Sequence, residues 1–396
     1  MRLLILLSAL LLVNGCSEMA DIQLQEISTV SGENSSLPSL YTDNTGIVFM
    51  SWVEERGNIA ELHFATFKNN TWSEPSVISA DSTWFLNWAD YPSIIGHNGQ
   101  PMAAHWLNKK PGGTYAYDVN ISAYTHQWSE RIIPHQDKTP TEHGFVSMLP
   151  ASDSTFMMVW LDGRKTAGRE HHEYADISKA MTLRGAIIDQ NGQIKEKFLI
   201  DDAVCDCCNT SLAKTDNGFI VTYRNRTEDE IRDIYSSIFR DGSWSEPKPV
   251  HNDNWKIAAC PVNGPAVGVQ NEVVATSWFT GANGESKLQL GISNNHGTDF
   301  DTVISVDDQN AIGRTDLLIS DGKIWVSWLS SVNNYGKLNL ASYSLDGNPL
   351  NQYSIPNISK ERSTGFPQLV SSENSLLIAF TDVSEESKRI RMFELK

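Results

Sequence analysis

The feature that most constrains this chain is a pattern that recurs seven times along it. Each unit holds a short strand, a small turn, an apolar strand with an aromatic residue near its end, a polar loop and an alternating strand. Alternation with period two is typical of half-buried strands. The aromatic residue marks the register, at spacings of 50 to 63 residues: Trp52, Trp106, Trp160, Tyr223, Trp278, Trp328 and Phe380. The chain is therefore predicted to be all-β with an internal repeat.

Seven units of three or four short strands predict a single β-propeller, in which each blade buries its apolar faces against its neighbours. The last unit offers only three strands, at 368–370, 376–380 and 389–395. The alternating segment Ile22–Ile27 precedes the first full unit and is predicted to supply the missing fourth strand. Such closure removes exposed sheet edges. Seven blades are expected, or six if one unit is misjudged.

The first residues are typical of a targeting segment. Arg2 precedes an apolar run over residues 3–13, and this run is too short for a bilayer, which needs about 20 residues. The run leads to Cys16 in a Val-Asn-Gly-Cys sequence that resembles a bacterial lipobox. The resemblance implies cleavage before Cys16, a lipid on that cysteine and a place in the bacterial cell envelope, with Ser17 favouring the outer membrane. The alternative is an ordinary cleaved signal. The predicted division is 1–15 as signal peptide, 16–30 as lipid anchor, tether and closing strand, and 31–396 as propeller.

The charge balance excludes some partners. The chain has 31 Lys and Arg against 48 Asp and Glu, a formal charge of −17. Nucleic acid is therefore excluded as a bulk partner, because its binding depends on neutralising phosphates. An acidic glycan or a small anionic ligand remains compatible, provided that a local cluster of arginines holds it. We expect a monomer that contacts a membrane only through its lipid anchor.

One turn links the chain to a known superfamily. Residues Ser293–Phe300 resemble a degenerate Asp-box, with Asn295 in place of the usual aspartate, and 68–72 and 240–244 occupy the same turn of their units. The chain thus resembles the sialidase-like (BNR/Asp-box) superfamily of secreted propellers. This resemblance implies a β-propeller that binds or hydrolyses an acidic glycan, as an exo-glycosidase of sialidase-like type would. The motif lies on a structural turn, so it indicates architecture more than activity.

The loops between blades and the loops after each second strand share one face of a propeller. Their aromatic and polar residues are candidates for ligand binding: Trp84, Trp88, Trp255, Glu142 and His143. Sialidases hold the substrate carboxylate with three arginines, and a guanidinium group binds a carboxylate through two parallel hydrogen bonds. Four arginines are candidates for that role: Arg164, Arg224, Arg226 and Arg314. The alternative is that they bridge loop carboxylates such as Glu228, Asp229, Glu230 and Asp233.

The resemblance also implies a tyrosine nucleophile, a partner glutamate and an acid/base aspartate. The first two have no assignment in the sequence. Asp90, between Trp88 and Tyr91, is the candidate for the third. An Arg-Ile-Pro motif, which true sialidases carry near the start of the first blade, is absent here. Catalysis and simple binding therefore both stay open.

Four cysteines besides Cys16 form the most unusual feature: Cys205, Cys207, Cys208 and Cys260. An even number in an exported protein favours disulfides. A strained Cys207–Cys208 bridge would leave Cys205–Cys260 as a clasp between blades. The alternatives are a thiolate site for copper or zinc and free reactive thiols. No cofactor is expected unless the cysteines form a copper or zinc site. Under that alternative, the chain would be a non-catalytic propeller that binds a metal or docks to a protein.

The third unit is lengthened by the insertion Lys165–Ala180, which contains His171 and His172. A polar loop over a propeller channel is often a lid or a binding loop. We expect a solvated loop here, with metal binding by the two histidines as the alternative.

Overall fold

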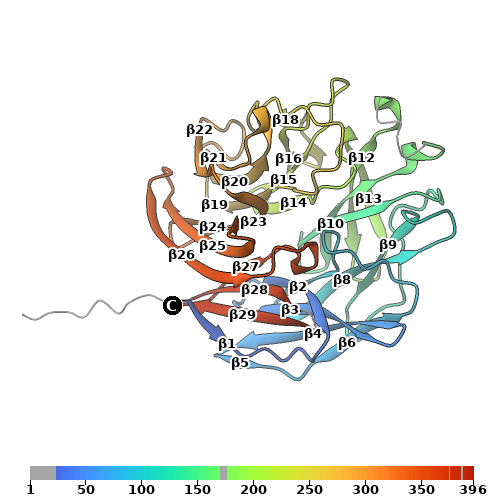
Figure 1. Cartoon of the computed structure of the whole chain (residues 1–396). Helices are drawn as coiled ribbons and strands as arrows, with labels where there is room; N and C mark the ends of the chain where they lie inside the picture. The colour runs from blue at the N-terminus through green and yellow to red at the C-terminus, as the bar shows by residue number, and fades with distance from the viewer. Residues whose placement is uncertain (1–23, 170–175, 374, 385–386) are drawn as a thin grey trace, which may run out of the picture.

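The computed structural model describes residues 24–169, 176–373, 375–384 and 387–396. Its strands form seven antiparallel sheets, which confirms the prediction of an all-β, seven-bladed β-propeller (Figure 1). Within these described ranges, no helix is long and apolar enough to cross a membrane. The helices in the same ranges are short 3-10 turns: η1 (Arg164–Thr166), η2 (Ile177–Lys179), η3 (Ala282–Gly284) and η4 (Arg362–Thr364).

Each blade is one sheet, and in blades 1 to 6 its strands are consecutive in the chain. Blade 1 holds β2 (Ser35–Thr42), β3 (Val48–Arg56), β4 (Ile59–Lys68), β5 (Thr71–Trp72) and β6 (Ser76–Asp81). Blade 2 holds β7 (Ser93–His97), β8 (Gln100–Lys109) and β9 (Tyr117–Ala123). Blade 3 holds β10 (His143–Pro150), β11 (Thr155–Asp162), β12 (Met181–Asp189) and β13 (Ile194–Val204). Blade 4 holds β14 (Ser211–Thr215), β15 (Gly218–Arg224), β16 (Ile234–Arg240), β17 (Ser243–Trp244) and β18 (Lys248–Pro249).

The remaining blades follow the same order. Blade 5 holds β19 (Ala266–Gln270), β20 (Val273–Thr280), β21 (Lys287–Ser293) and β22 (Thr302–Asp307). Blade 6 holds β23 (Ala311–Ser320), β24 (Lys323–Val332), β25 (Tyr335–Ser344) and β26 (Pro349–Ile358). Blade 7 holds β27 (Gln368–Ser372), β28 (Ser375–Val383), β29 (Lys388–Leu395) and β1 (Leu24–Ile27).

The ring closes on itself at its centre and at its edge. First strands of successive blades contact one another all the way round, from β2 through β7, β10, β14, β19, β23 and β27 back to β2. At the outer edge of blade 7, β1 pairs antiparallel with β29, with Leu24 opposite Leu395 and Ile27 opposite Met392. Figure 1 shows these terminal strands side by side. The predicted closing strand is thus confirmed from Leu24 onward, and the first two residues of the predicted segment lie outside the described ranges.

The core lies between neighbouring blades, as expected of units that cannot bury their apolar faces alone. All seven register-marking aromatic residues are buried in second strands. A buried indole N–H needs an acceptor. The N–H of Trp160 therefore donates to Asp162 at 3.0 Å, and that of Trp328 donates to Asp307 at 2.8 Å. Each of these hydrogen bonds joins the aromatic residue of a second strand to an aspartate at the end of a strand, and so helps to fix the position of the second strand in its sheet.

The Asp-box-like residues form the turn between β21 and β22. The Ser293 hydroxyl accepts from the Gly297 amide at 3.0 Å, and the Asn295 side chain accepts from the Asp299 amide at 3.0 Å. Phe300 packs against the apolar clusters of blades 4 and 5. Because this turn joins third and fourth strands, it lies at the opposite end of the blade from the loop between second and third strands.

Blade 2 departs from the repeat, because in the described structure it has a three-stranded sheet. In place of a fourth strand, Ile132 exchanges two backbone hydrogen bonds with Ile121, at 3.0 and 2.9 Å, and Trp128 forms a bridge with Tyr124. The chain beyond carries Pro134, which has no amide hydrogen to extend the ladder. The connection from blade 2 to blade 3 is therefore an irregular loop.

The closing strand gives the first testable prediction. Deleting residues 17–27 exposes the edge of β29 and removes Leu24 and Ile27 from the apolar clusters that they contact. We expect this deletion to lower the free energy of unfolding by roughly 2 kcal/mol or more, measured by denaturant titration. Deleting only residues 17–23 is the matched control and should leave stability unchanged. Equal stability of both deletions would show that β1 does not close the ring.

Candidate functional site

The face made of the between-blade loops and the loops joining second to third strands is called the mouth here. Asp90 lies in the loop before blade 2, Tyr117 begins β9, and Glu142 immediately precedes β10. A parallel bridge between Tyr117 and Glu142 holds these two segments side by side. The three residues meet although 25 to 27 positions separate Tyr117 from the other two.

The Tyr117 hydroxyl is shared by the two carboxyl groups. It donates to Glu142 Oε1 and lies 3.3 Å from Asp90 Oδ2. The other oxygen of Asp90 accepts from the Phe145 amide at 2.7 Å. Gly144 is required for this packing, because a Cβ atom there would lie 1.9 Å from Asp90 Oδ2. Tyr117 and Asp90 are buried, and Glu142 is the half-buried member of the three.

Both carboxyl groups hold their protons more tightly than usual. Burial raises the pKa of Asp90 to about 7, against the hydrogen bonds from Phe145 and Tyr117. Burial also raises the pKa of Glu142 to about 8; Tyr117 lowers it, and the charges of Asp90 and Asp206 raise it further. A carboxyl group in an apolar surrounding favours its neutral form. Near neutral pH, Glu142 is therefore mostly protonated.

A network of ion pairs begins at Asp206, whose charge acts on Glu142. Asp206 pairs with Arg169 at 2.7 Å and lies 3.7 Å from Arg226. Glu230 binds Arg226 at 2.6 Å and Arg232 at 2.8 Å. The candidate Arg226 is thus held by carboxylates, with its side chain fully buried. This network extends the polar region of the mouth from blade 3 into blade 4.

Two other candidate arginines are bound to main-chain carbonyl groups. The Arg224 guanidinium donates to the carbonyls of Asn263, Arg232 and Phe279 at 2.6 to 3.1 Å. It also lies over the buried ring of Trp255, 4.8 Å from its centroid. Arg224 therefore bridges segments of the structure, as the structural alternative predicted. Its acceptors are main-chain carbonyl groups, whereas the prediction named loop carboxylates. A role for Arg224 in gripping a ligand stays a prediction.

Arg314 is bound in the same manner. Its guanidinium donates to the carbonyl of Glu361 at 2.8 Å, and the carbonyls of Lys360 and Gly365 lie at 3.4 and 3.5 Å. It stacks 4.7 Å from the centroid of the Trp88 ring. Burial, together with the nearby charge of Arg362, lowers the pKa of Arg314 to about 10. Arg314 therefore fastens the loop between blades 6 and 7 to the mouth.

Arg164 and His143 belong to a separate cluster between blades 2 and 3. Arg164 binds Asp162 through two hydrogen bonds, at 2.6 and 2.7 Å. His143 lies 3.1 Å from Asp137 and stacks on His135 at 3.8 Å between ring centroids. Burial acts to raise the pKa of Asp137, but hydrogen bonds from the two histidines lower it strongly. Asp118, His135 and His143 also form a group spaced closely enough to hold a metal ion.

A cavity of about 500 Å³ opens on the mouth beside Trp88. Its walls include Glu55, Arg362 and Lys388. This volume falls in the range of small-molecule sites. Trp88 is itself stacked on Phe366, with centroids 5.8 Å apart. Of the other candidate aromatic residues, Trp84 is buried and stacks on Trp106, so it contributes to packing.

The four cysteines are free thiols, and three of them gather in the loop after β13. The Cys205 and Cys208 sulfurs are 2.9 Å apart, and the Cys260 thiol interacts with that of Cys207. The structure therefore unites the two cysteine groups of adjacent blades. It places Cys205 beside Cys208, whereas the predicted clasp joined Cys205 to Cys260. A disulfide pairing stays a prediction, and His171 and His172 lie outside the described residues.

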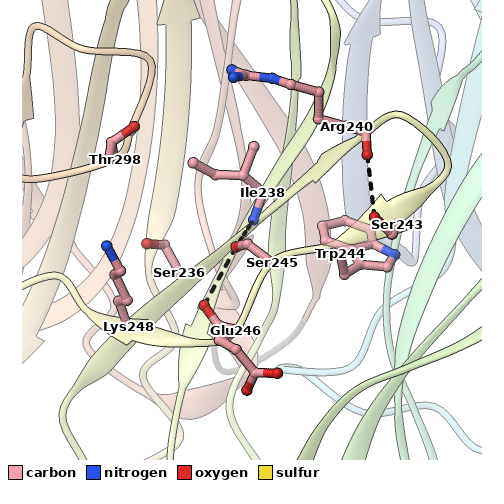
Figure 2. A pocket seen from close by; sticks show the side chains of 10 residues that line it. Ser236, Ile238, Arg240, Ser243, Trp244, Ser245, Glu246, Lys248 and Thr298 are labelled. Carbon is pink, nitrogen blue, oxygen red and sulfur yellow. Dashed lines mark hydrogen bonds between the residues drawn. The ribbon is translucent and has the colours of Figure 1, made fainter.

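A second groove, of about 330 Å³, lies on the outer part of blade 4 (Figure 2). Arg240, Trp244 and Lys248 line it, together with Thr298 from the Asp-box-like turn of blade 5. Since the turns at Arg240 and Thr298 join third and fourth strands, this groove lies away from the mouth. It contains none of the candidate site residues predicted from the sequence.

Comparison with known proteins places the fold. No family model matches the chain, and no curated protein sequence matches it. An ulvan lyase of polysaccharide lyase family PL25 is similar at TM-score 0.52 and 11% identity, over 94% of this chain and 96% of that one. A phage phi92 endosialidase matches at TM-score 0.49 and 10% identity, over 95% of this chain and 69% of that one. The Hadza microbial sialidase Hz136 matches at TM-score 0.49 and 12% identity, over 92% and 66%. The chain is thus a seven-bladed propeller that shares its fold with a carbohydrate-active enzyme.

The raised pKa values predict an unusual pH dependence of stability. Above the ordinary pKa values of these two groups, the folded protein keeps protons that the unfolded chain has lost, on Asp90 up to about pH 7 and on Glu142 up to about pH 8. The free energy of unfolding contributed by these groups therefore falls as pH rises, by at most about 1.4 kcal/mol per pH unit for each group. Denaturant titrations across this range test it. Glu142→Gln should flatten the decline, and an unchanged slope in that variant would contradict the assignment.

The contacts of Arg314 predict a structural role. Arg314→Ala leaves loop carbonyls without their charged donor, and we expect it to lower the free energy of unfolding by about 2–3 kcal/mol. Arg240→Ala, at an exposed arginine on blade 4, is the matched control and should cost little. Thermal melts of both variants check this. If Arg314→Ala melts with the control, the carbonyl contacts do not stabilise the loop.

Proposed function

We propose that this protein is an exported glycosidase that hydrolyses an acidic glycan at the mouth of the propeller. The observation that carries the proposal is the trio of Asp90, Tyr117 and Glu142, in which one phenol joins two carboxyl groups of raised pKa. Tyrosine, glutamate and aspartate are the residue types that the sialidase-like resemblance implies. Groups with pKa values near neutrality suit general acid and base catalysis.

Glu142 is assigned as the general acid. With a pKa of about 8, it is protonated at neutral pH, and it is the member of the trio that reaches the surface. Since its Oε1 atom accepts the Tyr117 hydrogen bond, its proton is left on Oε2. From there it can pass to the oxygen of a glycosidic bond as that bond breaks.

Asp90 is assigned as the proton acceptor. Water attacks the anomeric carbon as the bond to the leaving oxygen breaks; the proton that this water loses passes to the Tyr117 oxygen, and the Tyr117 proton passes to the buried carboxylate of Asp90. Its pKa of about 7 leaves a substantial ionised fraction near neutral pH, and it contacts the same phenol as Glu142. Tyr117 thus connects a carboxylic acid to a carboxylate and fixes their relative placement. Proton loss from Asp90 and proton retention by Glu142 occur together in a narrow pH window, because the pKa of Asp90 is about 7 and that of Glu142 is about 8.

The substrate is proposed to be acidic because Arg362 lines the cavity beside Trp88 and can pair with a carboxylate or sulfate group on a sugar. Lys388 lines the same cavity and pairs with Glu55 at 3.6 Å, and Glu361 adds a second carboxylate to its walls. The ulvan lyase that shares this fold was solved with a saccharide containing GlcA, an acidic sugar. We further propose, from the lipobox-like sequence at Cys16, that the enzyme is a lipoprotein of the bacterial cell envelope, in the outer membrane.

The proposal is tested with fluorogenic aryl glycosides of sialic acid and of glucuronic acid. Glu142→Gln keeps the shape of the side chain and cannot donate an acid proton, so we expect kcat to fall by about 10²–10⁴. Wild-type activity should peak between about pH 7 and pH 8. Asp90→Asn should remove the fall in activity below pH 7, because that fall reflects protonation of Asp90.

Tyr353→Phe, a tyrosine on β26 away from the mouth, is the control for Tyr117→Phe and should retain full activity. Tyr117→Phe itself should lower kcat while the protein stays folded. Undiminished activity of Glu142→Gln would overturn the assignment of the acid. Release of an unsaturated uronate would show elimination in place of hydrolysis.

A further inference from the structure

The cysteine cluster has the composition of a metal site. The sulfur atoms of Cys205, Cys207 and Cys208 all lie within 4.8 Å of one another. Cys205 and Cys208 are buried, Cys207 is half-buried, and Cys260 is exposed beside it. Three thiols from one turn thus lie close together, and a fourth, that of Cys260, contacts Cys207 from outside this group.

The backbone explains how one short segment presents three thiols. Val204 ends β13, and residues 206–207 form a turn that brings Cys205 and Cys208 together. The Cys205 amide donates to the Arg224 carbonyl at 2.9 Å, which fixes the start of the turn against blade 4. Cys260 arrives from the next between-blade loop. The site therefore joins two loops that are distant in sequence and adjacent in the ring.

We propose that Cys205, Cys207, Cys208 and Cys260 bind one Zn²⁺ ion. Four thiolates at about 2.3 Å from zinc form a closed tetrahedral structural site, with sulfurs about 3.8 Å apart. The 4.8 Å limit on the three inner sulfurs accommodates that spacing. The Cys205 and Cys208 sulfurs, now 2.9 Å apart, need to separate by only about 0.9 Å to reach it.

The surrounding charge suits thiolate ligands. The Arg232 guanidinium donates a hydrogen bond to the Cys205 sulfur at 3.5 Å. Glu230 holds that guanidinium in place at 2.8 Å. Such contacts orient a ligand and stabilise its negative charge. A zinc ion with four thiolates carries two negative charges, and Arg232 compensates one of them.

Zinc binding would fix the position of the loop that contains Asp206. Asp206 lies between two of the ligands in sequence and pairs with Arg169 at 2.7 Å, and its charge acts on Glu142. Zinc would therefore fix a loop that borders the mouth. This inference does not depend on hydrolysis there, since a propeller without glycosidase activity would still hold the ion.

The test is metal analysis of the full-length protein, purified without added chelator. We expect one zinc per chain and, after exchange with Co²⁺, the charge-transfer absorption of a tetrahedral cobalt–thiolate site. Cys260→Ser removes the exposed ligand with little risk to folding. We expect it to weaken zinc binding by more than about 100-fold, since loss of a mere outer partner already costs 10–100-fold.

His135→Gln is the matched control, because it disrupts the other group able to hold a metal ion, Asp118–His135–His143. It should leave zinc content unchanged. Full zinc content in a triple serine variant of the three inner cysteines would overturn the proposal. A zinc-free protein whose mass shows two disulfides would overturn it equally, and would establish the disulfide alternative.

Discussion

The pairing of β1 with β29 is the contact on which the rest of the molecule depends. Seven sheets can stack side by side without it, but the seventh would end in an open strand edge. No hydrogen-bonded strand from the beginning of the propeller would then hold blade 7 to blade 1. With β1 in place, the first and last parts of the chain belong to one sheet. The inner strands then contact one another around the whole centre, and loops from blades 2, 3 and 4 meet at fixed positions on the mouth.

The mouth derives its chemistry from burial. Asp90 and Glu142 would be ordinary ionised carboxylates in water. Packed against Tyr117, Gly144 and each other, they become weak acids near neutral pH. The same burial requires the neighbouring arginines to bond to protein groups, because each guanidinium needs several hydrogen-bond acceptors once water is excluded. Burial thus both raises the pKa values of the two carboxyl groups and makes the arginines hold the neighbouring loops through hydrogen bonds.

Much of the fold was predictable from the sequence, because the relevant signals are local and recur. Alternation and a buried aromatic residue define each blade, and a short alternating segment near the N-terminus indicated the closing strand. The site was only partly predictable. Asp90 could be picked out between two aromatic residues, but Tyr117 lies 27 residues further along the chain, at the start of β9, and carries no local mark. The partners of Arg224, such as the carbonyls of Asn263 and Phe279, lie in loops that meet it only in the closed ring. The proximity of Cys207 to Cys260 followed from their equivalent positions in adjacent blades.

The central claim is that Glu142 keeps its proton at neutral pH. The most direct measurement is the titration of glutamate side-chain carboxyl carbons by NMR in wild-type protein, with Glu142→Gln used to assign the signal. Our account predicts that the Glu142 signal titrates near pH 8. A signal that titrates near pH 4.5, the ordinary value for glutamate, would contradict it.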